Sequence, residues 1–142
     1  MTRTRRAPRW LKLVNPLNRW LLGHGIGPPA QRLLSITGRR TGQVRTTPVA
    51  LVALDGHRYL VAGFAGSDWV SNARAAGRGQ LRRGRAVEDV TLTELTVADR
   101  GPVLRAFARE VRGGRPFLGV SAQAPDTAFR DAATAHPVFR VD

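Results

Sequence analysis

The chain has 142 residues, 42% of them hydrophobic, which suits one globular domain with a buried core and excludes an intrinsically disordered chain. Cysteine is absent, which excludes disulfides, thiolate metal sites and a cysteine nucleophile. Lysine and arginine number 23 against 10 aspartates and glutamates, so the net charge of +13 favours acidic ligands, nucleic acid or an anionic membrane as partners.

The first part of the chain is basic and partly apolar. Residues 1–8 predict a disordered basic tail, and residues 9–142 predict a single domain. Apolar side chains recur at helical spacing over residues 9–22, which predicts an amphipathic helix that covers one end of the core. The alternative is that this helix lies on an anionic membrane, at its inner face. No run approaches the ~18 apolar residues of a membrane span and no secretory cleavage site follows, so we expect a cytoplasmic protein.

A basic turn between two strands is the most distinctive local pattern. Residues 32–37 and 45–54 are rich in β-prone side chains. Between them lie Gly38, Arg39, Arg40, Thr41, Gly42, Gln43 and Val44, and Arg45 follows. Both glycines can adopt positive φ, so we expect backbone amides to line a concave turn, with the arginines as donors to phosphate or carboxylate. The alternative is an ordinary hairpin whose arginines are solvated.

The rest of the chain predicts a small β-barrel or meander with three or four helices around it. Asp55-Gly56 is a strong hairpin signal, Ser67 and Asp99 are predicted helix N-caps, and Pro48 predicts an edge position or a bulge. Further strands are predicted at residues 57–62, 79–83, 85–95 and 136–141, helices at residues 68–76, 99–111 and 126–133, and a basic loop at residues 112–116. The fold class is therefore mainly β with α.

The side chains available for chemistry are few. His24, His57 and His136 lie in different elements without metal-ligand spacing, so we expect no metal site and structural or exposed histidines. No nucleophile elbow, phosphate-loop lysine or zinc motif is present, so any redox chemistry belongs to a bound cofactor. Besides the basic turn, the helix start at Ser67-Asp68-Trp69 predicts a place for a phosphate, and Trp69 either stacks on a flat ring or joins the core.

These pieces together resemble one family. Their order is Thr37-Gly38-Arg39-Arg40-Thr41-Gly42, then Arg45-Thr46-Thr47-Pro48, the Asp55-Gly56 hairpin, a glycine-rich loop and an Asp68-Trp69 helix. The pattern is similar to the deazaflavin-dependent nitroreductases or quinone reductases, small split β-barrels of the FMN-binding/PNPOx-like kind that use coenzyme F420. The resemblance covers about residues 10–95, and residues 136–141 resemble an ending seen among relatives.

The resemblance implies an F420-dependent oxidoreductase that passes a hydride from the reduced deazaflavin to a quinone, nitro compound or activated alkene. The cofactor's phosphate and acidic tail would lie on the basic turn, and no catalytic residue is implied. By motif position the cofactor contacts would be Arg39, Arg40, Thr41, Arg45, Thr46, Thr47, Pro48, Gly63, Phe64, Ala65, Gly66, Ser67, Asp68 and Trp69. The implied partner is a small-molecule electron acceptor, and the assembly is a monomer or a homodimer.

Two departures from the family keep alternatives open. Gly63-Phe64 stands where the family often has a serine and a lysine, and Tyr59 is the only tyrosine, whereas the best-known nitroreductases use tyrosines near the C-terminus. One alternative is a non-catalytic split barrel that binds a deazaflavin, a flavin or a lipid. A second is a basic nucleic-acid-binding protein, supported by the charge and by Arg82-Arg83-Gly84-Arg85, although no recognised binding motif accompanies them.

Overall fold

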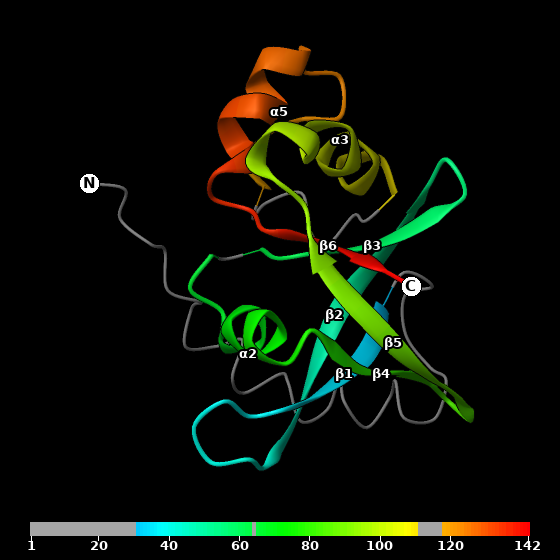
Figure 1. Ribbon diagram of the computed structural model, residues 1–142. Helices are drawn as coiled ribbons and strands as arrows, with labels where there is room; N and C mark the ends of the chain where they lie inside the picture. The colour runs from blue at the N-terminus through cyan, green and yellow to red at the C-terminus, as the bar shows by residue number, and fades with distance from the viewer. Residues whose placement is uncertain (1–30, 64, 111–117) are drawn as a thin grey trace.

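Six antiparallel strands form a closed barrel in the computed structural model, which describes residues 31–63, 65–110 and 118–142 (Figure 1). Around the barrel the strands follow the order β1-β2-β3-β6-β5-β4. The strands are β1 Gln31–Thr37, β2 Val44–Leu54, β3 His57–Val61, β4 Arg78–Arg83, β5 Ala86–Glu94 and β6 Val138–Val141. The helices are α2 Asp68–Ala76, the 3-10 turn η1 Val97–Asp99, α3 Gly101–Glu110 and α5 Asp126–Ala133. The predicted fold class is confirmed.

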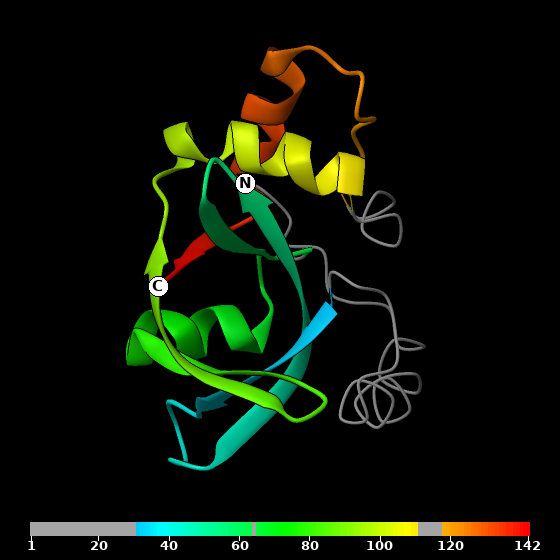
Figure 2. The same ribbon diagram turned by 90° about the vertical axis from the view of Figure 1, so that its right-hand side faces the viewer.

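The helices cover two different parts of the barrel (Figures 1 and 2). Helices α3 and α5 lie together on the outward side chains of β2, β3 and β6, among them Val52, Val61 and Val138. Helix α2 instead adds Val70 and Ala73 to the cluster inside the barrel. We call the end that this helix covers the α2 end, and the opposite end, where β3 begins and β4 passes into β5, the open end.

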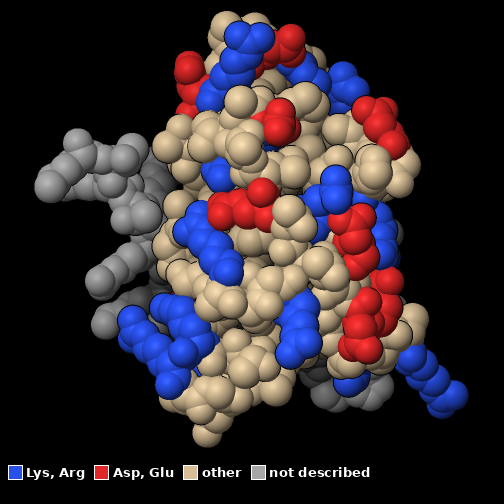
Figure 3. Space-filling model, viewed as in Figure 1, with Lys and Arg blue, Asp and Glu red and all other residues tan. Residues whose placement is uncertain are grey.

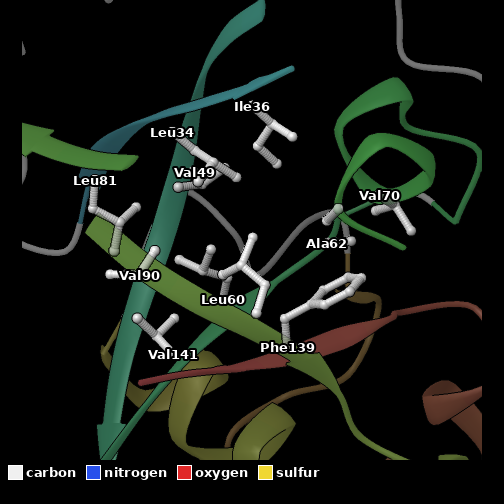
Figure 4. Packing of buried hydrophobic residues seen from close by; sticks show 12 residues of the cluster. Leu34, Ile36, Val49, Leu60, Ala62, Val70, Leu81, Val90, Phe139 and Val141 are labelled. Carbon is white, nitrogen blue, oxygen red and sulfur yellow. The ribbon is translucent and has the colours of Figure 1, made fainter. Parts of the chain in front are cut away.

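Inward-facing aliphatic and aromatic side chains fill the barrel (Figure 4). Successive side chains of a strand point to opposite faces, and residues paired across two strands share a face. Leu34 of β1 is therefore on the same side as its β4 partner Leu81, and both are buried. Burying such a side chain contributes about 1.5–3 kcal/mol, so this interior is a main source of stability.

The predicted strands and helices are confirmed within the described residues, with small shifts at their ends. At the hairpin turn, Asp55 and Gly56 have φ of 51° and 77°, as a primed two-residue turn requires. Pro48 pairs with Leu33 of β1, while β3 pairs with β2 only from Ala50 onward, so the proline lies at a local edge as expected.

The predicted cap at Asp99 is wrong. Asp99 is the last residue of η1, and its Oδ2 accepts a hydrogen bond of 3.0 Å from Thr96 Oγ1, so its carboxylate is used by this short turn. Helix α3 begins only at Gly101. The predictions for residues 1–8, the helix over 9–22 and the loop over 112–116 lie outside the described residues. Within the described ranges, no helix combines the length and the apolarity needed to cross a membrane.

Candidate functional site

The basic turn closes on itself through its backbone. The amide of Gly38 donates to the Gln43 carbonyl at 2.7 Å, and the amide of Gly42 donates to the Gly38 carbonyl at 3.0 Å. Gly42 has a φ of 73°, as expected, but Gly38 is needed for space, because an added Cβ would lie 2.9 Å from the Gln43 oxygen. Gly38 is not among the glycines with positive φ, and the amides of both glycines are used inside the turn, so we expect anion recognition here to depend mainly on the side chains.

Arg39 joins the turn to helix α2. Its backbone amide and its Nη1 both donate to Oδ1 of Asn72, at 3.1 and 2.9 Å, and its Nη2 lies 3.9 Å from Asp68 Oδ1. Asn72 is 4% exposed, and it lies one helical turn after Asp68. The basic turn and the helix start, widely separated in sequence, are therefore side by side. The sequence reasoning missed Asn72, whose signal is an amide on the otherwise apolar inner face of α2.

The predicted residues on β2 divide between the two faces of the strand. Arg45 and Thr47 pair with Ile36 and Leu34, which point into the barrel, so they face the inner side. Thr46 and Pro48 alternate with them and face outward. Thr46 Oγ1 lies 2.8 Å from Ser35 Oγ across the β1–β2 pair. One ligand on one face of β2 therefore meets only two of these four side chains.

The loop before α2 offers fewer groups for binding a ligand than the sequence predicts. Ser67 occupies the N-cap position, but its side chain makes no capping hydrogen bond. Asp68 projects into solvent with a side chain that is 91% exposed. Trp69 is half-buried, with its ring centroid 5.5 Å from that of Phe139, which favours the core interpretation of this tryptophan. Phe64 lies outside the described residues.

A buried histidine, His136, fixes the start of this loop. A structural role was among the expectations for it, but the sequence reasoning missed its contact with the loop. His136 Nδ1 lies 3.0 Å from the Ala62 carbonyl, and the Ala62 amide donates to Pro137 at 2.9 Å. Burial lowers the pKa of His136, so the ring is neutral at pH 7 and donates its Nδ1 proton to the carbonyl. Ala62 directly precedes Gly63, so these bonds hold the loop at the α2 end. The available signal was a histidine before a proline at a strand start.

Three arginines from the turn and β2 gather at the α2 end. Arg40 and Arg45 are exposed, and the Arg39 side chain is 29% exposed, so all three guanidinium groups reach solvent. Figure 3 shows basic side chains over this turn, at the lower left. Forked guanidinium donors suit phosphates and carboxylates, so the residues present fit a cofactor that carries such groups. In the described part of the chain, no group of three metal-ligating side chains occurs.

Comparison with known proteins identifies the fold. A solved structure described as a domain-swapped dimer has 18% identity and a TM-score of 0.58, covering 94% of this chain and 97% of that one. An F420-H2 dependent reductase has 21% identity and a TM-score of 0.56, covering 82% and 96%. A Clostridium acetobutylicum protein of the pyridoxinephosphate oxidase family has 11% identity and a TM-score of 0.50, covering 79% and 73%. The barrel is therefore a split β-barrel of the FMN-binding type.

The family comparison covers most of the chain. The model of the F420H2-dependent quinone reductases matches residues 18–115, which include the basic turn, the loop and α2. The match makes coenzyme F420 the cofactor and an oxidoreductase the class of enzyme. The chain belongs to the F420H2-dependent quinone reductase family.

Proposed function

We propose that the α2 end binds coenzyme F420 and that the protein passes a hydride from its reduced form to a quinone, nitro compound or activated alkene. The observation that carries this proposal is the joint formed by Arg39 and the buried Asn72, which holds exposed arginines beside the start of α2. Among the acceptors we favour a quinone, because the family description supports it. When bound, the reduced cofactor supplies the hydride.

The chain's own residues bind and orient in this proposal. Arg39, Arg40 and Arg45 bind the phosphate and the acidic tail as forked cationic donors. Asn72 positions Arg39, because its single Oδ1 accepts from both the backbone and the guanidinium of that residue. His136 keeps Gly63 in place through the Ala62 carbonyl, so it is a positioning residue. On β2 we propose cofactor contacts for Arg45 and Thr47, which share the inner side of the strand. Thr46 and Pro48 face the outer side, so a ligand on the inner side does not reach them.

A fluorescence titration with F420, beside FMN, tests the binding site. We expect Arg39→Gln and Arg45→Gln each to weaken F420 binding tenfold or more, which is about 1.4 kcal/mol. Arg130→Gln on the exposed face of α5 removes the same charge far from the turn and should leave the affinity unchanged. Equal losses in all three variants would mean a general attraction to the charge of +13. Equal affinity for FMN would instead support a general flavin-binding module.

Turnover tests the acceptor separately. The oxidation of reduced F420 is followed after addition of a quinone, a nitroimidazole or an unsaturated lactone, and we expect the quinone to react fastest. Tight F420 binding without oxidation by any acceptor would contradict the enzyme proposal and leave a binding protein.

We also propose that the protein forms a homodimer, which the solved structure described as a domain-swapped dimer supports. Light scattering after size-exclusion chromatography measures this. A mass near 15.5 kDa would mean a monomer and would overturn the proposal.

A further inference from the structure

The open end of the barrel contains a second group of arginines, separate from the α2 end. A cavity of about 590 Å³ opens there, over Leu51 and Leu81. Among the described residues that line it, four are arginines and one is acidic: Arg32, Arg58, Arg82, Arg83 and Glu88. Figure 2 views the molecule from this side. The lining is therefore strongly cationic, although the cavity lies at the mouth of an apolar interior.

The strand register shows why three of these arginines face inward. Arg32 pairs with Val49, and Arg58 pairs with Val141, and both valines belong to the cluster inside the barrel. Arg83 follows the inward-facing Leu81 by two residues, so it shares that face. Three inward positions at this end thus carry guanidinium groups, beside aliphatic partners such as Val49 and Val141. We call Arg32, Arg58 and Arg83 the mouth arginines.

Their contacts bring like charges together. Nη1 of Arg32 and Nη1 of Arg83 both donate to the carbonyl of Gln31, at 2.9 and 3.1 Å. Burial, and then the charge of Arg83, lower the pKa of Arg32. Across the barrel, Arg58 donates two hydrogen bonds to Glu88. These bonds raise the pKa of Arg58, and the negative charge of Asp142 raises it further. One lining carboxylate therefore faces several converging guanidinium groups, and this arrangement favours a further anion.

We propose that the open end is an anion-binding site for a small molecule with two or more phosphate or carboxylate groups. One such group would engage Arg32 and Arg83 and the other would approach Arg58 in competition with Glu88, while Leu51 and Leu81 form the apolar floor. The volume lies within the range of small-molecule sites. Because the proposal uses none of the residues of the α2 end, it stands or falls independently of F420 binding.

The test uses pyrophosphate and citrate as the two probes, one for each chemistry. Calorimetry at about 0.15 M salt, where long-range attraction is screened, should give one saturable site for at least one probe. We expect Arg32→Gln and Arg83→Gln to weaken binding tenfold or more. Arg130→Gln and Arg39→Gln, matched in charge but placed on α5 and at the α2 end, should have little effect.

A variant that is expected to bind the probes more tightly provides a sharper test. Glu88→Gln removes the lining carboxylate and should tighten binding severalfold, whereas Asp131→Asn on the exposed side of α5 should not. In ¹⁵N NMR spectra, the amides of Gln31, Leu81 and Val87 should shift on titration. Shifts confined to residues 38–43, no saturable binding, or equal losses in all four arginine variants would overturn the proposal. Thermal melts of each variant check that the barrel is intact.

Discussion

The two ends of the barrel carry their arginines in different settings. At the α2 end a helix covers the apolar interior, Arg39 and Arg40 lie on the turn between β1 and β2, and Arg45 follows on the inner side of β2. Asn72 fixes Arg39. At the open end the mouth arginines occupy inward positions themselves. The comparison teaches that total charge says little about function, because the place of an arginine in the barrel decides which groups surround its guanidinium.

The largest effect should come from a substitution in the barrel interior, which supports both ends. Leu60 is fully buried in the middle of the barrel cluster. We expect Leu60→Ala to lower the free energy of unfolding by about 2–5 kcal/mol, because it removes apolar contact and leaves a cavity. Urea denaturation measures the loss, and Thr93→Ala at an exposed position of β5 is the control. A loss similar to that of the control would contradict the role of this interior.

Asn72→Ala should affect the α2 end alone. The change removes the acceptor of two Arg39 hydrogen bonds from a buried position, so we expect a loss of about 1–3 kcal/mol of stability. F420 affinity should fall as well, while pyrophosphate binding at the open end should persist. Parallel titrations of both ligands measure the difference. If both affinities fell together, the two ends would not be independent.

His136 should make the α2 end sensitive to acid. Its pKa is lowered in the folded state, so the unfolded chain binds the proton more tightly, and stability falls as the pH drops below about 6.5 toward the folded-state pKa. His136→Asn should flatten the dependence between pH 7 and 5.5. Urea midpoints at several pH values measure this. An unchanged slope in the variant would assign the dependence to another group.

The smallest effect should come from the ion pair at the open end. Hydrogen bonding to Arg58 lowers the pKa of Glu88, so its contribution is present above pH 4.5 and is lost as the pH falls through the folded-state pKa. Because the Glu88 side chain is 48% exposed, solvent screening limits this contribution to about 0.2–1 kcal/mol. Glu88→Gln should therefore remove little stability at pH 7. A loss of stability above that range would mean that the pair of Arg58 and Glu88 is an important support of the fold.

Local patterns predicted the elements well because their causes are local. The Asp55-Gly56 turn, the glycine after α2 and the alternation along β1 and β2 each depend on neighbouring residues. The joint between Arg39 and Asn72 could not be read in this way, since it depends on how α2 folds back on the turn. The inward position of Arg83 was equally hidden. Arg82 and Arg83 look like one solvated run until pairing with β1 and β5 assigns them to opposite faces.

The placement of β6 has a consequence for how the chain folds. The sheet β1–β2–β3 and the hairpin β4–β5 form between neighbouring segments, but β6 must pair with β3 on one side and β5 on the other to complete the ring. Val61 of β3 pairs with Val138 of β6, although α2, β4, β5, α3 and α5 lie between these two residues in the sequence. Because the entropy of closing a loop is lost before such distant contacts are gained, we expect the four-residue strand β6 to join the barrel late in folding.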